Sequence, residues 1–331
     1  VPQKRGFDEF YGFVIGGHRY FPKDLTLNDL TEARSQMDGY ITKIFDNGKR
    51  VDISKYLTEE LSDNAVKFID ENSENPFFVY LSYNAPHTPL QATKKDLDRN
   101  MHIKGEKRRT YAAMVTSLDD GVGLILDKLV EKNISDNTIV VFFSDNGGVE
   151  WYNHSDNGIL RGGKGEFFEG GIRVPFVMQW PNVIPAGLTY DKPIISLDIF
   201  ATAASVANAE KYIDGDIDGV NLIPYILGQK DGLPHKFLYW QNRDKDIDVI
   251  RGERYKYLRM ADEEFIFDLK NDISEENNII DISKEIYDDY KFRFKEWDKE
   301  MIDPIFLDLG SGKQYNKLHP DRWYNSSSKK Q

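Results

Sequence analysis

The sequence predicts an α/β protein in which helices cover a mixed, mostly parallel sheet, followed by a smaller antiparallel sheet with one helix. Two apolar runs, residues 76–83 (PFFVYLSY) and 137–144 (NTIVVFFS), are typical of buried central strands. Between them, residues 113–132 place apolar side chains at intervals of three and four, which predicts an amphipathic helix. A strand, a helix and a second strand in that order favour a crossover connection within one sheet.

The remaining elements continue this alternation. We expect an earlier helix from Thr58, whose side chain suits an N-cap and precedes two glutamates at the positive end of the helix. A strand at residues 174–180 and a helix at residues 198–207 extend the α/β pattern. After about residue 234 the pattern changes to short aromatic strands and a final helix, expected at residues 237–241, 255–260, 264–269 and 283–300.

Three regions are expected along the chain. They are an α/β domain at residues 1–230, an α+β subdomain at residues 231–309 and a polar tail at residues 310–331. The polar, glycine-containing stretch at residues 228–232 marks the first boundary. Val1 is not an initiator Met and no signal-peptide run follows it. We therefore expect an internal fragment whose catalytic domain is incomplete at the N-terminus.

The composition excludes several classes of protein. Of the 331 residues, 40% are hydrophobic, yet no run approaches the roughly 20 apolar residues that span a bilayer. A formal net charge of -12 disfavours nucleic acid as a partner. The absence of cysteine excludes disulfides, cysteine-ligated zinc and thiol nucleophiles, but it leaves the cellular compartment open.

His87 lies in the loop that follows the first predicted strand. Pro86 and Pro89 restrict the backbone around it and would fix the direction of the imidazole. Ligands of open α/β sheets bind at the carboxyl ends of strands. His87 is therefore a candidate acid or anion ligand, and the alternative is an exposed loop histidine without a role.

Asp145 and Asn146 end the second predicted strand and precede two glycines that allow a tight turn. Carboxylate and amide oxygens are hard ligands that suit calcium or magnesium. The alternative is an ordinary Asx turn. Two ligands are too few for a calcium ion, which takes about six to eight oxygens, so further carboxylates must come from another segment.

Residues 160–175 place five glycines around Lys164, ahead of the predicted strand at residues 174–180. Glycines allow the backbone to approach an oxyanion closely, and the lysine supplies a point charge for a sulfate or phosphate oxygen. The spacing is not that of a P-loop. The alternative is a flexible surface loop.

In this order, the segments NAPHTP (84–89), SDNGG (144–148) and LRGGKG with EGGIRVP (160–175) resemble the second half of the formylglycine-dependent sulfatase family, part of the alkaline-phosphatase-like superfamily. Residues 4–13, 255–257 and 267–269 are also similar to family segments. The resemblance covers nearly the whole chain.

The resemblance implies an alkaline-phosphatase-like fold and a sulfuric ester hydrolase. It implies that Asp145 and Asn146 bind a divalent cation, usually calcium with magnesium as the alternative. Lys164 would bind the sulfate, and His87 would contact its bridging oxygen and protonate the leaving alcohol. His18 is similar to a family position bordering the substrate pocket, with a packed loop histidine as the alternative. The implied substrate is a sulfated carbohydrate or aryl ester, and the implied location is periplasmic or extracellular.

The sequence departs from the family at the nucleophile. Upstream of the matching region, family members carry an Asp-Asp metal pair, a Cys/Ser-x-Pro-x-Arg motif whose first residue becomes formylglycine, and a Lys-x-His pair; none is found there in this sequence. We therefore expect the nucleophile on another polypeptide, or a catalytically inactive chain. A missing N-terminal polypeptide and a homo-oligomer are both candidate partners.

Two other functions stay open. A phosphatase or phosphodiesterase of the same superfamily would need a Ser or Thr nucleophile and more metal-binding residues, and the lysine-glycine loop disfavours it. A non-catalytic protein that binds anions or sulfated glycans would keep the pocket without turnover.

Overall fold

The computed structural model describes residues 2–243 and 245–302. They belong to two compact units, residues 2–157 with 175–186 and residues 158–174 with 187–243 and 245–302. Each unit is described by itself. The boundary expected near residue 230 falls inside the second unit and stays a prediction. The polar tail at residues 310–331 lies outside the described residues.

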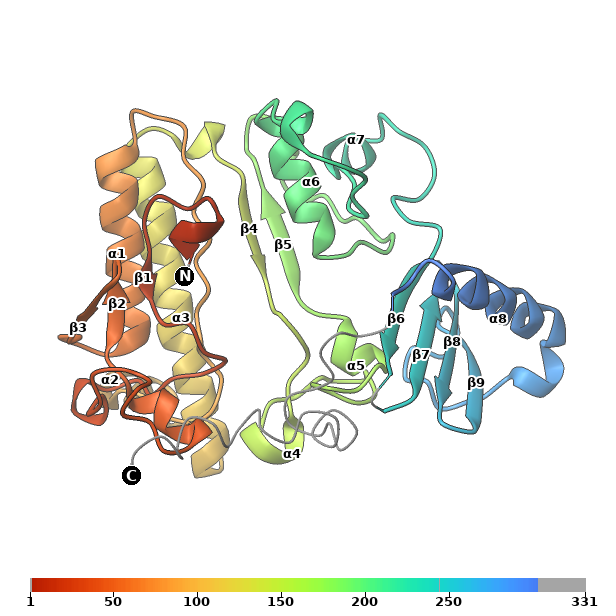
Figure 1. Ribbon diagram of the computed structural model, residues 1–331, viewed down its shortest axis with the longest axis horizontal. Helices are drawn as coiled ribbons and strands as arrows, with labels where there is room; N and C mark the ends of the chain where they lie inside the picture. Colours follow the sequence, from red (N-terminus) through yellow and green to blue (C-terminus); the bar gives the residue numbers. More distant parts are fainter. Residues whose placement is uncertain (1, 244, 303–331) are drawn as a thin grey trace, which may run out of the picture. The chain divides into compact units, whose positions relative to one another are not determined.

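Two long helices dominate the first unit. α1 (Leu57–Asn72) and α3 (Glu106–Glu131) lie side by side (Figure 1), and α2 (Lys94–Arg99) and α4 (Glu150–Asn153) are short. Leu57 and Leu61 of α1 share a buried apolar cluster with Met114 of α3. The helix expected at residues 113–132 is confirmed and begins earlier, at Glu106. Short 3-10 helices lie at Pro2–Arg5, Pro22–Asp24, Gln36–Ile41 and Ser135–Asn137.

The predicted N-cap of α1 is wrong. Tyr56 occupies that position without a side-chain cap, and Thr58 lies inside the helix, fully buried. Tyr56 is held instead by packing and by its hydroxyl, which donates to the carbonyl of Gln91 at 2.7 Å. Tertiary contacts therefore set the start of this helix more strongly than capping preference does.

Strands of the first unit form two small antiparallel sheets. One contains β1 (Tyr11–Gly12), β2 (Ile44–Asp46) and β3 (Lys49–Val51), and the other pairs β4 (Val140–Phe143) with β5 (Phe176–Gln179). β4 and β5 confirm the strands expected at residues 137–144 and 174–180, and both are shorter than expected. Parallel pairing within the described residues is limited to the bridge between Leu27 and Thr42.

The buried strand predicted at residues 76–83 is not formed. This segment has no strand assignment, and Phe78 and Tyr80 are 59% and 66% exposed. Some of its side chains still face inward, since Phe77 packs edge-on against Phe68 of α1 and Leu81 and Tyr83 pack against the core cluster of this unit. An apolar run becomes a strand only where a neighbouring strand offers backbone groups, and no described strand pairs with this one.

The second unit contains a four-stranded antiparallel sheet with the strand order β6-β7-β8-β9. The strands are β6 (Leu238–Asn242), β7 (Ile247–Arg251), β8 (Tyr255–Met260) and β9 (Glu263–Asp268), and the helices are α5 (Glu169–Ile172), α6 (Leu197–Val206), α7 (Ile223–Ile226) and α8 (Lys284–Asp298). Short 3-10 helices lie at Glu210–Tyr212 and Ile280–Ile282. The α/β class and the C-terminal antiparallel sheet with its helix are confirmed, whereas β7 was not predicted.

Both faces of this sheet are buried. Successive side chains of a strand point to opposite faces, and each face carries its own buried cluster. α8 lies against β7 and β8 (Figure 1). Ile250, Tyr257 and Ile266 of the sheet form one buried cluster with Tyr290 and Phe294 of α8. On the other face, Phe168 joins a buried cluster with Val249, Leu258, Phe267 and Leu269. Phe168 belongs to the glycine-rich segment, so that segment is part of the core of this sheet.

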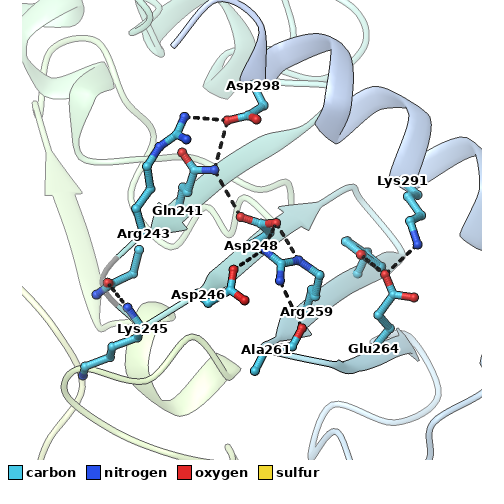
Figure 2. A network of polar contacts seen from close by, with 12 residues as sticks. Gln241, Arg243, Lys245, Asp246, Asp248, Arg259, Ala261, Glu264, Lys291 and Asp298 are labelled. Carbon is cyan, nitrogen blue, oxygen red and sulfur yellow. Dashed lines mark hydrogen bonds and ion pairs between the residues drawn. The ribbon is translucent and has the colours of Figure 1, made fainter. Parts of the chain in front are cut away.

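Charged side chains link the strands to each other and to α8 on the α8 side of the sheet (Figure 2). Arg259 donates to Asp248 at 2.7 Å, and Gln241 donates to Asp298 of α8 at 3.0 Å. Lys291 of α8 donates to Glu264 at 2.8 Å. These contacts fasten α8 at two points along its length.

No helix within residues 2–243 and 245–302 is long and apolar enough to cross a membrane.

Candidate functional site

His87 lies in a tight turn that is anchored by the hydroxyl of Tyr20. Its backbone N–H donates to the carbonyl of Asn84 at 2.7 Å, and the hydroxyl of Tyr20 lies 2.7 Å from the carbonyl of His87. The Nδ1 atom lies 2.8 Å from the carbonyl of Thr88. A carbonyl can only accept, so Nδ1 carries a proton and Nε2 is the ring atom that can give or take one.

His18 lies on a neighbouring segment and is fully buried. Its Nδ1 atom donates to the carbonyl of Arg19 at 3.0 Å, and its ring lies 4.8 Å from that of Phe13. Burial lowers the pKa of His18, opposed in part by the backbone carbonyls of Arg19 and Thr42. His18 is therefore neutral near pH 7, and its predicted position at the substrate pocket stays a prediction.

The His18 and His87 segments are joined directly. Asn84 donates from its side-chain amide to the carbonyl of His18 at 3.2 Å. Tyr20, two residues after His18, reaches the carbonyls of both Asn84 and His87. The structure thus brings these two predicted residues onto one hydrogen-bonded frame.

Asp145 and Asn146 follow β4 immediately, as the sequence predicts. Asp145 is exposed, and Asn146 is half-buried. Asn146 donates from Nδ2 to the carbonyl of Gly147 at 2.9 Å, and Ser144 donates from its hydroxyl to the carbonyl of Asn146 at 2.9 Å. Oδ1 is the side-chain atom of Asn146 that can coordinate a cation, because the amide nitrogen is a donor only.

The donor atoms at this strand end suit calcium in kind, since they are a carboxylate and an amide oxygen. Their number is insufficient: within the part of the chain that the structure describes, no three His, Asp or Glu side chains group closely enough to hold a metal ion. Calcium binding at Asp145 and Asn146 therefore stays a prediction that requires further ligands.

The segment after β4 is closed by one side chain. Asn157 accepts from the backbone N–H of Gly148 at 2.9 Å and donates to its carbonyl at 3.0 Å. Arg108 of α3 donates to the carbonyl of His154 at 2.7 Å. These bonds hold the chain that leaves Asp145 and Asn146 in a compact loop.

Lys164 occupies the tip of a turn in the second unit. The N–H of Glu166 donates to the carbonyl of Gly163 at 2.9 Å, and a carboxylate oxygen of Glu166 accepts from the N–H of Gly163 at 2.9 Å. Gly165 has a φ of +83°, which the third position of a type II turn requires and which only glycine adopts readily. The Lys164 side chain is exposed at this tip.

Two further glycines let the start of α5 fit against this loop. A Cβ atom at Gly170 would lie 2.4 Å from the carbonyl oxygen of Gly162, and one at Gly171 would lie 2.1 Å from that of Glu166. Real Cβ atoms do not approach oxygen so closely, so a side chain at either position would force the loop apart. The glycines at these two positions therefore allow the close approach of α5 to the loop.

The predicted residues therefore fall into two groups. His18, His87, Asp145 and Asn146 belong to the first unit, and Lys164 belongs to the second.

Three further residues of the second unit, Glu169, Lys256 and Glu275, lie fully buried together and were not predicted from the sequence. The available signal was Lys256 itself, which alternates with Tyr255 and Tyr257 along a strand at a position facing the core. A lysine at such a position is rarely buried unless it is paired.

Two family profiles match consecutive, overlapping parts of this chain. The profile of the sulfatase family matches residues 1–209, and a profile described as the C-terminal part of N-sulphoglucosamine sulphohydrolase matches residues 163–300. The second match begins inside the glycine-rich loop, which belongs to the unit that contains the C-terminal sheet.

Individual relatives point the same way. The chain is 34% identical over 242 residues to the uncharacterized sulfatase YdeN of Escherichia coli, covering 72% of this chain and 40% of YdeN. It is 38% identical over 190 residues to human steryl-sulfatase, covering 55% of this chain and 32% of that enzyme. The chain thus spans less than half the length of these curated relatives.

A solved structure matches almost the whole chain. The crystal structure of Ps i-CgsB superposes with a TM-score of 0.85 at 34% identity, covering 98% of this chain and 74% of that one. A family profile that matches well over half of the residues and this structural relative together establish the family. The chain belongs to the sulfatase family.

Proposed function

We propose that the protein carrying this chain hydrolyses sulfate esters, and that these residues supply the sulfate-binding lysine, the leaving-group acid and part of the metal shell. The observation that supports this most is the position of Lys164 at the tip of a glycine-defined turn, in a chain of the sulfatase family. A lysine at such a tip can place its ammonium against a sulfate oxygen while the glycines keep the backbone out of the way.

His87 is proposed as the acid. Its Nδ1 proton is committed to the carbonyl of Thr88, so a proton donated to the leaving group would come from Nε2. Protonation of the bridging oxygen assists departure of an alkoxide, which is a poor leaving group. The fixed turn between Asn84 and His87 would hold Nε2 in one direction.

Asp145 and Asn146 are proposed as two oxygen ligands of a calcium ion. The other ligands, and the formylglycine nucleophile that the family resemblance implies, would come from outside the described residues. A bound divalent cation would supply positive charge to the sulfate oxygens as negative charge shifts toward them.

The proposed substrate is a sulfated oligosaccharide or polysaccharide. The structural relative Ps i-CgsB has been crystallised in complex with k-i-k-neocarrahexaose. A substrate of this kind also suits the family resemblance, which implies a periplasmic or extracellular location; that location stays a prediction.

The test uses the full-length protein that contains these residues, purified from its native source. Release of inorganic sulfate is measured from carrageenan oligosaccharides and from 4-nitrophenyl sulfate, with 4-nitrophenyl phosphate and its diester as comparison substrates. Turnover of sulfate esters that falls roughly a hundredfold or more in Lys164→Ala supports the proposal.

Other outcomes separate the alternatives. Faster turnover of the phosphate diester would favour a phosphodiesterase. Binding of a carrageenan oligosaccharide without turnover of any ester would identify a glycan-binding protein. The loss in His87→Ala should be larger for the oligosaccharide than for 4-nitrophenyl sulfate, because nitrophenolate leaves without protonation.

A further inference from the structure

We propose that the buried cluster of Lys256, Glu169 and Glu275 is a positioning device that holds the Lys164 loop in its anion-binding shape. This inference rests on the proposed role of Lys164. It assigns a function to three side chains that touch neither substrate nor metal in the proposed mechanism.

The cluster is compact and hydrogen-bonded. The ammonium of Lys256 lies 2.8 Å from a carboxylate oxygen of Glu275 and 3.2 Å from one of Glu169. The other carboxylate oxygen of Glu275 accepts from the backbone N–H of Glu169 at 2.6 Å. Arg251 and Arg173 approach Glu169 at 3.7 and 4.0 Å, so three positive and two negative side chains meet.

Burial of these charges is nearly complete. Lys256 and Glu275 are 0% exposed and Glu169 is 1% exposed. They lie on the sheet face covered by Phe168, among Leu258 and Phe267. Burial raises the pKa of Glu275, although Lys256 beside it acts in the opposite direction. Such a cluster is a poor source of stability, because desolvation offsets the attraction between its charges.

The contacts of Glu275 give the buried charges a role in holding the loop. Glu275 binds both ends of the loop: its side chain takes the N–H of Glu169, and its carbonyl accepts from Arg161 at 2.8 Å. The loop closes between the same ends, since Gly170 donates to the carbonyl of Arg161 at 2.7 Å. Arg161 also stacks 4.0 Å above the ring of Phe168.

Lys256 holds the side chain of Glu275, which in turn binds the ends of the loop. It is the cation paired with both carboxylates, and it comes from the middle of the sheet, 87 residues from Glu169 in sequence. With both ends of the loop fixed, the turn from Gly163 to Glu166 has one arrangement and Lys164 projects from a defined point. Without that fixation, binding an anion must also order the loop, which lowers affinity.

The experiment compares variants of the full-length protein. Lys256→Met alone leaves the buried carboxylate of Glu275 without its cation, and Glu169 with only the more distant arginines, and can unfold the protein. The double variant Lys256→Met/Glu275→Gln removes one charge of each sign, and the amide oxygen that replaces the carboxylate can still accept from the N–H of Glu169. The matched control is Lys291→Met, which removes the 2.8 Å ion pair with Glu264 on the opposite face of the same sheet.

Two readouts are used on variants whose circular dichroism shows a native fold. Titration with inorganic sulfate reports affinity, and hydrogen exchange reports the peptide covering residues 161–170. We expect the double variant to bind sulfate roughly tenfold more weakly and to exchange faster in that peptide, with α8 unchanged. Lys291→Met should leave both readouts at the wild-type values.

The outcomes separate this inference from the proposed function. If the folded double variant matches wild type in sulfate affinity and exchange, the positioning role is wrong. If Lys164→Ala binds sulfate as wild type does, the proposed role of Lys164 fails. Faster exchange in the double variant would then show that the cluster orders a loop with another purpose.

Discussion

The buried hydroxyl of Tyr20 lies 2.9 Å from the carbonyl of Asn84 and 2.7 Å from the carbonyl of His87. One donor therefore serves two acceptors of the turn that carries the proposed acid. Tyr20→Phe should remove the hydroxyl from both carbonyls, of which that of Asn84 keeps the N–H of His87, and lower the free energy of unfolding by about 1–3 kcal/mol. Urea denaturation measures that loss.

The same substitution should slow turnover of substrates with poor leaving groups, since the His87 turn loses its anchor. Tyr212→Phe is the control, because Tyr212 is 77% exposed. An unchanged rate in a destabilised Tyr20→Phe would show that the anchor matters for folding alone.

Gly171→Ala should destabilise the protein by about 2–4 kcal/mol, because the added Cβ would lie 2.1 Å from a backbone carbonyl oxygen. Sulfate affinity should fall with it, since the turn at Lys164 must open. The control is Gly123→Ala in the interior of α3, where a Cβ meets nothing within 4 Å. That change should stabilise by up to about 1 kcal/mol. Thermal unfolding of both variants measures these two changes in stability.

Glu264 predicts a pH dependence of stability. Burial by itself raises the pKa of Glu264, but hydrogen bonds from Lys291, Tyr287 and Tyr257 outweigh it and bring the pKa to about 2. A carboxyl whose folded pKa is depressed stabilises the fold above its unfolded value of 4.5, and this contribution is lost as pH falls toward 2.

Wild type should therefore exceed Glu264→Gln in unfolding free energy at about pH 6, and the difference should shrink between pH 4.5 and pH 2. Urea denaturation of both proteins across this range measures it. Exposed Glu263, changed to Gln, should show no such difference. A difference in unfolding free energy between wild type and Glu264→Gln that stays constant as pH falls would show that the pKa of Glu264 is not depressed in the folded protein.

Asp145→Ala should reduce the calcium content of the full-length protein from stoichiometric to substoichiometric, because a calcium shell that loses a carboxylate loses affinity. Elemental analysis after dialysis measures the metal without reference to activity. Exposed Asp136, changed to Ala, is the control. Full calcium in Asp145→Ala would show that this carboxylate is no ligand.

The sequence predicts an element well where local pattern decides it. β4, β5, α3 and α8 arise from apolar periodicity that suits the same element in isolation and in the fold. Residues 76–83 carry an equally strong apolar pattern, but strand formation depends on a partner backbone that periodicity cannot supply. β7 was missed because the charged residues around Asp248 obscure a short run whose neighbours in the sheet complete it.

The candidate site shows the same division. His87, Asp145 and Lys164 stand out because prolines, a strand end and glycines mark their loops in the sequence. Glu275 and Lys256 do not, because their role depends on meeting Glu169, which lies 106 residues before Glu275 in sequence. Contacts over such separations are set by the packing of the whole unit.

The placement of Phe168 and Glu169 in the core of the C-terminal sheet bears on how this protein can be divided. A gene fragment ending at residue 230 would keep Lys164 in its product but strip away the surface against which its loop folds. Conversely, a product starting after residue 175 would keep the sheet and lose the covering of one face. The loop that carries the lysine and the C-terminal strands therefore belong to one folding unit, which a truncation between residues 175 and 230 would divide.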